Sequence, residues 1–579
     1  MKSTLLSGLV LFLGLINNSF AQTNIISTNP LAEKIMTGKY DPSVYKATKV
    51  LNLPDTIVKG INKRVSADSL KVYLEILRTF KNRNTGSDTL SKSNGMGAAR
   101  RWVFGKFVQF SKANENRLTP SYLQFDQLIC LQNQHRNIFA VLPGTDTTDK
   151  SIIIIEAHID SRCKDVCDTA CLAEGMEDNG SGTALVLELA RVMSKYSFNH
   201  TLVFLLTIAE EQGLNGAEAF ADYVQLKGIK VKAVLNNDVI GGVICGQTAS
   251  QPGCSGAGLV DSLNVRIFSI GGFNSFHKGL ARYTKLQYNT RVKPIAKVKM
   301  NINIMTPEDR TGRGGDHIPF RQHNYTAIRL TAANENGNAD VTNVNYTDRQ
   351  HTVSDILGLD TDNDKKIDSF FVDFNYLARN AVINGCTGGM IGICPATPDF
   401  TLSTDWVSKL TVNITQQTGY LKYKVGVRST TNDWDSVYYF TGTTFTFSVS
   451  NPATYIVSVC SVDALGVESI FSKEIQTKIS GLEEINGPLK SVELLQNKPN
   501  PSDEATMFTV IVNSNEKFKD ACISINDLTG KEVHRIPIEL SRGVNEVEYN
   551  HGYHQSGIFI YTLLIDGKPI QSKRMVFSN

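Results

Sequence analysis

The chain has 579 residues, of which 41% are hydrophobic and 20% charged, and its 59 basic and 56 acidic side chains leave a formal net charge of +3. This length is too great for one domain, so we expect about three or four. The near balance of charge, without basic runs or interleaved basic and aromatic residues, argues against a nucleic-acid or polyanion partner.

The first 21 residues have the pattern of a secretory signal peptide. Lys2 gives a short positive start, "LLSGLVLFLGLI" is too short to span a bilayer, and "SFA" before Gln22 fits a cleavage site. No later stretch is apolar enough to be a transmembrane anchor. We therefore expect an exported, soluble chain that begins at Gln22.

Residues 22–63 carry little periodicity and are predicted to be an N-terminal arm or a propeptide. Helices are predicted at residues 66–80, where Ser66 is the candidate cap, and at residues 97–111. A strand is predicted at residues 136–144, ending in a Pro-Gly turn.

Apolar strands then alternate with amphipathic helices. The strands are expected at residues 151–158, 201–211, 231–242 and 325–331, and the helices at residues 181–196, 216–228 and 368–385, the last stopped by Gly385. Strands without polar alternation, separated by helices, predict an α/β fold: a mixed, mostly parallel sheet with helices on both faces. We assign this domain to residues 64–394.

After Cys394 the helical patterns stop. Short alternating strands such as "LKYKVGVRS" and "TYIVSVCSVD" predict a β-sandwich over residues 395–480. A polar linker follows at residues 481–491, and residues 492–579 form a second β-rich domain.

Imidazole and carboxylate side chains follow several of the predicted parallel strands. Taken singly, each has an ordinary explanation, such as a helix N-cap for the aspartate before residue 181. However, carboxyl ends of parallel strands share one sheet edge, where ligands bind in open α/β folds. The side chains brought to that edge are His158, Asp160, Asp178, Glu210, Glu211, Asp238 and His351.

This set of side chains suits catalytic zinc, because it offers histidine and carboxylate and no cysteine. Two histidines and three carboxylates exceed the needs of one tetrahedral ion. They fit two zinc ions about 3.5–4 Å apart that share a carboxylate and a water molecule. One carboxylate is left to act as a general base.

The motifs "HID", "EDNGSG", "AEEQGLNGA", "NND" and "HTVSD" resemble, in order and spacing, the secreted bacterial aminopeptidases with two zinc ions, relatives of glutamate carboxypeptidase and the transferrin receptor. The resemblance covers residues 66–385. It implies that His158 and Asp238 bind one zinc, Glu211 and His351 the other, and Asp178 both.

The same resemblance implies that Glu210 is the general base and that Asp160 orients His158. It also implies cleavage at the N-termini of peptides or proteins. "GGDHIPF" resembles a segment on the active-site side of the family, so Asp316 and His317 are assigned a substrate-shaping or supporting role. A turn fixed by Pro319 is the alternative.

Three other readings of the catalytic domain stay open. A glutaminyl cyclase has the same fold with one zinc. A carboxypeptidase for acidic C-termini would need an arginine-lined pocket, and Arg310, Arg313 and Arg321 lie close to the "GGDHIPF" segment. A binding protein with an inactive peptidase fold is disfavoured by the intact ligand set and Glu210.

The cysteines are expected to form disulfides in an exported chain. Two disulfides that each close a short loop are predicted, Cys245–Cys254 and Cys386–Cys394. A further group, Cys163, Cys167 and Cys171, lies close together in the sequence, with Cys130 upstream. For this group we favour disulfides over a thiolate metal cluster.

The segment "DTDNDKKID" at residues 360–368 has part of the spacing of an EF-hand loop. Lys365 stands where that loop needs glycine and Phe371 where it needs a bidentate glutamate. We favour a capped acidic helix start, with one structural Ca²⁺ as the alternative.

The two β domains have their own resemblances. Residues 395–480 resemble a fibronectin type III domain. "QNKPNP", "DLTGKEV" and the residues around Lys573 resemble the C-terminal sorting domain of the type IX secretion system of Bacteroidetes. This implies the type IX machinery as a partner and a location outside the cell or on the outer-membrane surface. The alternative is a further β-sandwich that has no role in sorting the protein.

Overall fold

The computed structural model describes residues 22–45, 47–48, 52–245, 256, 258–310, 314–333, 349–405, 408–416, 419–449, 453–479, 492–502, 505–515, 517–551, 556–578. The predicted signal peptide, the linker, Arg313 and Cys254 lie outside these residues.

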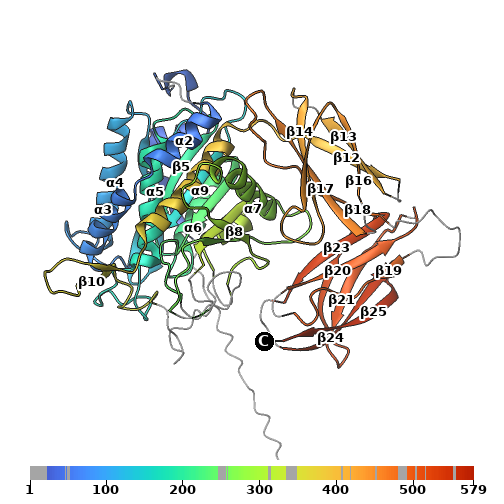
Figure 1. Cartoon of the computed structure of the whole chain (residues 1–579). Helices are drawn as coiled ribbons and strands as arrows, with labels where there is room; N and C mark the ends of the chain where they lie inside the picture. Colours follow the sequence, from blue (N-terminus) through green and yellow to red (C-terminus); the bar gives the residue numbers. More distant parts are fainter. Residues whose placement is uncertain are drawn as a thin grey trace, which may run out of the picture.

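A mixed sheet forms the centre of the α/β unit (Figure 1). Among the described residues it has nine strands in the order β1-β2-β3-β5-β4-β6-β9-β7-β8. The central strands β5, β4, β6 and β9 run parallel, whereas β2, β3 and β7 pair antiparallel with their neighbours, apart from the parallel pair β7–β8. The strands are β1 (Thr23–Ser27), β2 (Thr119–Ile129), β3 (Gln132–Leu142), β4 (Ile152–His158), β5 (Thr201–Thr207), β6 (Val231–Asn237), β7 (Asn264–Phe268), β8 (Asn301–Ile304) and β9 (Ala327–Ala332).

Helices cover both faces of this sheet, as predicted. One face carries α2 (Pro54–Arg64), α3 (Ala67–Leu77), α4 (Gly95–Ala113), α5 (Ser181–Met193), α7 (Phe276–Gln287) and α9 (Phe374–Ile393). The other carries α1 (Pro30–Met36), α6 (Asn215–Leu226) and α8 (His317–Gln322). Short helical turns lie at η1 (Pro42–Tyr45), η2 (Arg78–Phe80), η3 (Met176–Gly180) and η4 (Tyr288–Val292).

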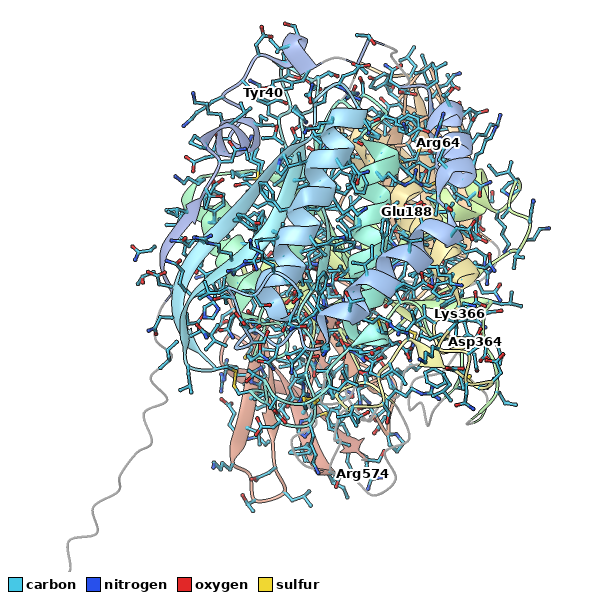
Figure 2. All side chains as sticks on the ribbon, turned by 90° about the vertical axis from the view of Figure 1, so that its left-hand side faces the viewer. Tyr40, Arg64, Glu188, Asp364, Lys366 and Arg574 are labelled. Atoms are coloured by element: carbon cyan, nitrogen blue, oxygen red, sulfur yellow. A yellow bond between two sulfur atoms is a disulfide. The ribbon has the colours of Figure 1, made fainter. Side chains whose placement is uncertain are left out.

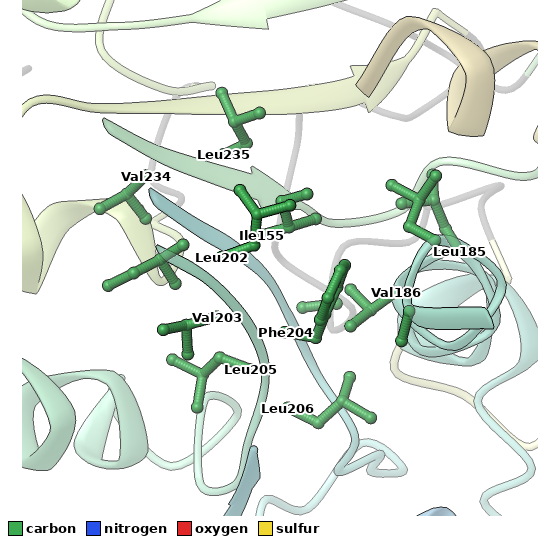
Figure 3. Packing of buried hydrophobic residues seen from close by; sticks show 14 of the residues in the cluster. Ile155, Leu185, Val186, Leu202, Val203, Phe204, Leu205, Leu206, Val234 and Leu235 are labelled. Atoms are coloured by element: carbon green, nitrogen blue, oxygen red, sulfur yellow. The ribbon is translucent and has the colours of Figure 1, made fainter. Parts of the chain in front are cut away.

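The isoleucine run of β4 lies at the centre of the core. Ile152, Ile153, Ile154 and Ile155 have no exposed surface. Figure 3 shows Ile155 beside residues of β5 and β6 and the side chains of α5. A strand that is buried on both faces is rigid, so the residues at its end are held in a fixed position.

The predicted stop of the last helix at Gly385 is wrong. Helix α9 begins at Phe374 and continues through four glycines to Ile393. A Cβ on Gly388 would lie 3.1 Å from Cδ1 of Ile155, and one on Gly392 would lie 2.8 Å from the ring of Phe198. The glycines therefore let the helix approach the sheet closely, and this packing outweighs their low helix propensity.

The N-terminal arm is an ordered part of the α/β unit. Strand β1 pairs antiparallel with β2, and Ile57 and Ile61 of α2 are fully buried. Strand β1 and helix α1 are too short to show a clear period, whereas α2 has 11 residues, as many as α3, and was missed although its length would allow a period.

Each β domain consists of two facing sheets in the described residues. The first has β12-β13-β16 against β15-β14-β17-β18, and the second β19-β20-β23 against β22-β21-β24-β25. The strands of the first are β12 (Asp399–Thr404), β13 (Lys409–Gln416), β14 (Lys422–Arg428), β15 (Ser436–Thr441), β16 (Thr444–Ser448), β17 (Ala453–Val462) and β18 (Ile475–Ile479). Those of the second are β19 (Val492–Leu494), β20 (Ala505–Val512), β21 (Ala521–Asn526), β22 (Glu532–Pro537), β23 (Gly543–Asn550), β24 (Gly557–Ile565) and β25 (Lys568–Phe577).

The first β-sandwich packs tightly against α7 of the α/β unit. Glu474 lies between Arg282 of α7 (Oε1–Nη2 2.7 Å) and Arg428 of β14 (Oε1–Nε 2.6 Å), and all three side chains are almost completely buried. Val467 and Phe471 of the sandwich also belong to the hydrophobic core of the α/β unit. The two domains therefore share one interior.

The cysteine predictions are confirmed in part. Cys130–Cys167 and Cys163–Cys171 are disulfides, so the thiolate cluster is excluded. Cys245 is disulfide-bonded, and its predicted partner Cys254 lies outside the described residues. The predicted Cys386–Cys394 disulfide is wrong: both thiols are free and buried. They stand eight positions apart along and just beyond α9, which corresponds to about 12 Å and exceeds the reach of a disulfide.

The predicted acidic helix start at residues 360–368 is also wrong. These residues connect two short strands, β10 (Gly358–Leu359) and β11 (Ser369–Phe370), and the helix begins only at Phe374, capped by Asp373. Asp364 and Lys366 of the loop lie at the surface (Figure 2). Among the described residues, no helix combines the length and the apolarity that a membrane span requires.

Candidate metal centre

Five predicted ligands meet at the carboxyl ends of the central strands. His158 is the last residue of β4, Asp238 follows β6, and Glu211 lies in the loop after β5. Asp178 belongs to the turn before α5, and His351 lies in a loop before β10. All five side chains are at least nine-tenths buried.

Asp178 lies between the two histidines. Its Oδ1 is 3.1 Å from Nε2 of His158, and its Oδ2 is 2.9 Å from Nε2 of His351. His158 also faces Oδ1 of Asp238 at 3.1 Å, and His351 faces Oε2 of Glu211 at 3.1 Å. The centre thus has two halves, each with one histidine and one carboxylate, joined by Asp178.

The Asp160 carboxylate connects strand β4 to the loop after β5. It lies 3.4 Å from Nδ1 of His158 and accepts hydrogen bonds from the main-chain amides of Glu210 (3.4 Å) and Glu211 (3.2 Å). The main-chain oxygen of Asp160 is 3.1 Å from the same Nδ1. Asp160 therefore orients a ligand of one half and the backbone of the other.

A second carboxylate holds the turn that carries Asp178. Asp355 accepts hydrogen bonds from the amides of Glu177 (2.8 Å) and Asp178 (3.0 Å). Because Asp355 lies four residues after His351, the "HTVSD" segment supplies one ligand and supports another.

Charge and burial shift the pKa values of the centre. Burial alone would lower the pKa of His158, but Glu210 and Asp238 outweigh it and hold this pKa well above its ordinary value. Burial would raise the pKa of Asp178, but hydrogen bonds with His158 and His351 hold it well below. These shifts show that the carboxylates favour a cation between them.

Glu210 has the opposite environment. Burial raises the pKa of Glu210 well above its ordinary value, and the neighbouring carboxylates of Asp238 and Glu211 add to this effect. Its Oε2 is 4.0 Å from Nε2 of His158, and the side chain is 12% exposed. A carboxyl group whose pKa is raised is a stronger base than an ordinary glutamate, which suits it to accept and return a proton.

The residues fit zinc on their donor chemistry. Ligand atoms of His158, Glu210 and Asp238 lie within 4.8 Å of one another, as do those of Asp178, Glu211 and His351. Within the described residues, Oε1 of Glu211 is buried and has no hydrogen-bond partner. A metal ion bound between Glu211 and His351 would satisfy this orphaned carboxylate oxygen.

A cavity of about 270 Å³ opens beside the ligands. Four of the five proposed ligands line it, all but His158, and Glu210 lines it as well. The other lining residues are Arg162, Gly213, Leu214, Arg310, Gly314 and Arg329. Arg310 contacts Asp309 (3.0 Å), whereas Arg321 pairs with Glu308 and does not line the cavity.

Asp316 and His317 lie behind this cavity and are not among its lining residues in the described structure. Asp316 accepts a hydrogen bond from the Thr207 hydroxyl and pairs with Glu156 of β4. Burial raises the pKa of Glu156 to about 7 and that of Asp316 well above its ordinary value. The geometry fits the supporting role and does not place either side chain where it would shape the substrate.

Two further groups outside the centre could also hold a cation. Glu218, Asp222 and His323 meet on the surface between α6 and α8, where His323 pairs with Asp222 at 2.9 Å. Asp360, Asp362 and Asp368 are exposed in the β10–β11 loop. Exposed acidic clusters are common without a metal, so we assign none to either.

The arginines near the centre carry roles that the sequence did not reveal. Arg329 of β9 donates to Oδ2 of Asp238 at 2.9 Å, and Arg162 donates to Oε2 of Glu211 at 2.7 Å. Arg83, fully buried, donates to the main-chain oxygens of Ile159 (2.8 Å) and Gly175 (2.9 Å). Of these three arginines, only Arg162 could have been noticed in the sequence, because it stands four residues after His158, just beyond the "HID" motif.

Several solved structures match part of the chain in fold at low sequence identity. The LapA aminopeptidase of Legionella pneumophila is 17% identical, with a TM-score of 0.41, over 57% of this chain and 73% of that chain. The glutaminyl cyclase of Porphyromonas gingivalis is 15% identical, with a TM-score of 0.37, over 56% of this chain and 97% of that chain.

Sequence relatives are more informative. Residues 137–373 match peptidase family M28. A protein of Leptosphaeria maculans named "Probable zinc metalloprotease" is 30% identical over 396 residues, which cover 65% of this chain and 87% of that protein. One with the same description from Phaeosphaeria nodorum is 29% identical over 384 residues, covering 62% and 73%. These relatives come from fungi, and together with the match to the α/β unit they show that the chain belongs to peptidase family M28, a family of zinc metallopeptidases.

Proposed function

We propose that this metallopeptidase is an aminopeptidase that uses two zinc ions to hydrolyse the first peptide bond of its substrates. His158 and Asp238 would hold one ion, Glu211 and His351 the other, and Asp178 both. The observation that carries this proposal is the position of Asp178, whose two oxygens face the two histidines at 3.1 Å and 2.9 Å.

Bound zinc supplies Lewis-acid activation of a water molecule and of the scissile carbonyl. Glu210 lines the cavity and takes the proton of the attacking water on its carboxylate. Its raised pKa allows it to hold that proton and return it to the leaving amine. Asp160 keeps His158 and the backbone of Glu210 and Glu211 aligned throughout.

Peptide or protein N-termini are the proposed substrates, because the motifs of the site resemble those of the two-zinc aminopeptidases. The cavity of about 270 Å³ beside the ligands is lined mostly by charged side chains, which suits a polar chain end.

Export and sorting belong to the same proposal. Residues 1–21 are a signal peptide, residues 395–480 a fibronectin type III-like domain, and residues 492–579 a type IX sorting domain. The disulfides at Cys130–Cys167 and Cys163–Cys171 fit an oxidising compartment. Mass spectrometry of the protein outside the cell should give an N-terminus at Gln22; a chain retained inside the cell with residues 1–21 intact would refute export.

The catalytic proposal is tested with Glu210→Gln. Release of p-nitroaniline from aminoacyl substrates should fall by about 10²- to 10⁴-fold while zinc stays bound. Glu218→Gln, a half-exposed glutamate of α6, is the matched control and should keep full activity. Unchanged turnover in Glu210→Gln contradicts the mechanism.

Blocked peptides separate the alternatives. An aminopeptidase should lose its activity on N-acetylated peptides and keep it on C-amidated ones, and a carboxypeptidase should do the reverse. Release of pyroglutamyl peptide without hydrolysis would instead support a glutaminyl cyclase.

A further inference from the structure

Arg162 contacts both terminal ligands of one half of the metal centre. Its Nε donates to Oε2 of Glu211 at 2.7 Å, and its Nη2 lies 2.7 Å from Nδ1 of His351. Its Nη1 donates to the main-chain oxygen of Lys164 at 3.2 Å. The side chain is 14% exposed, so a fixed positive charge lies directly behind this half.

The other half of the centre is supported differently. Behind His158 lies the carboxylate of Asp160, 3.4 Å from Nδ1. Arg329 contacts Asp238 through Oδ2, the oxygen that does not face His158, and it also binds Asp309. By contrast, Arg162 binds the same Glu211 oxygen that faces His351.

This difference has a direct consequence for metal binding. A histidine that binds metal through Nε2 carries its proton on Nδ1, and a carboxylate or carbonyl that accepts this proton strengthens the ligand. A guanidinium has only donors, so at His351 a donor faces a donor. Its charge also opposes that of a metal ion nearby, and it occupies Oε2 of Glu211, so that only Oε1 of this carboxylate is left for the metal.

We infer that the two metal sites have unequal affinities, and that Arg162 weakens the site formed by Glu211 and His351. The inference rests on the proposed two-metal function and makes Arg162 a positioning residue that controls occupancy. At low free zinc the chain holds one ion, at His158 and Asp238. The second site fills as the concentration of free zinc rises, so this concentration sets the fraction of fully loaded protein.

The test is a zinc titration of the full chain against chelators of graded affinity, which measures binding and not activity. The wild type should bind zinc in two steps, at least about ten-fold apart in affinity. Arg162→Met should strengthen the weaker step about ten-fold or more and leave the tighter one unchanged. Arg162→Lys, which keeps the positive charge, should leave the zinc affinity of the weaker step as low as in the wild type.

Arg136→Met is the matched control, because Arg136, on strand β3, pairs with Gln124 of β2 and does not line the cavity. Two equal steps in the wild type would overturn the inference. So would a weaker second step in Arg162→Met, since it would mean that Arg162 only holds Glu211 and His351 in place. A protein that binds two zinc ions unequally but cleaves no peptide would contradict the proposed function and leave this inference standing.

Discussion

The carboxylate of Asp160 accepts a hydrogen bond from the main-chain amide of Glu211 at 3.2 Å, although the two residues follow different strands of the sheet. The same carboxylate lies 3.4 Å from Nδ1 of His158. One side chain therefore fixes the distance between two proposed ligands of different metal ions.

Replacing this carboxylate should disturb metal binding and catalysis together. In Asp160→Asn the negative charge behind His158 is lost and one acceptor oxygen becomes a donor. Zinc affinity and kcat/KM should each fall by about 10- to 100-fold. Asp165→Asn, in an exposed turn where the carboxylate accepts the Cys167 amide, is the control. Wild-type zinc affinity in Asp160→Asn would show that Asp160 has no such role.

The first β-sandwich should be necessary for the stability of the α/β unit. Glu474→Ala leaves the buried guanidinium groups of Arg282 and Arg428 without their shared carboxylate. Breaking a buried ion pair from one side costs about 3–5 kcal/mol, measured as the free energy of unfolding in urea. Glu532→Ala, at an exposed pair with Arg535, should leave unfolding unchanged. Equal stability of the two variants would mean that the sandwich is only a spacer.

Stability should fall in mild acid because a histidine is buried in its neutral form. Burial lowers the pKa of His317 to about 4, below its ordinary value of 6.5. The unfolded chain takes up this proton first, so the free energy of unfolding falls as the pH drops from about 6.5 to 4, by up to about 3 kcal/mol from this residue. Thermal melts across this range should show a flatter pH profile for His317→Gln. A profile identical to the wild type would mean that His317 titrates normally.

Replacing a glycine of α9 by alanine should destabilise the protein, whereas the same replacement in another helix should stabilise it. Gly392→Ala would place a Cβ 2.8 Å from the Phe198 ring, and overpacking of this kind costs about 1–3 kcal/mol. Gly279 of α7 has no atom within 4 Å of its Cβ position in the described structure, so Gly279→Ala should stabilise the protein by about 0.5–1 kcal/mol. Chemical denaturation of both variants checks the pair; stabilisation by Gly392→Ala would contradict the packing argument.

The alternating strands and helices of the α/β unit could be predicted because buried parallel strands are apolar throughout. The residues that meet at the centre were found for the same reason: His158 ends such a strand, Asp238 directly follows another, and parallel strands end at one edge of the sheet. Which oxygen faces which nitrogen could not be derived, since it depends on loops such as the one carrying His351.

The failures have physical causes as well. Gly385 looked like a helix stop because propensity is local, whereas the packing of α9 on Ile155 and Phe198 involves residues distant in sequence. Arg329 was hidden inside an apolar strand, and its role depends on Asp238 and Asp309 from two other segments. Short strands such as β1 carry too few residues to show a period.

The most direct measurement is the number of zinc ions bound per chain at saturating free zinc, by equilibrium dialysis and elemental analysis of protein that is active on aminoacyl p-nitroanilides. Two ions per chain, reduced to one in His351→Ala with loss of turnover, is the predicted result. One ion per chain in fully active protein would contradict the two-metal account.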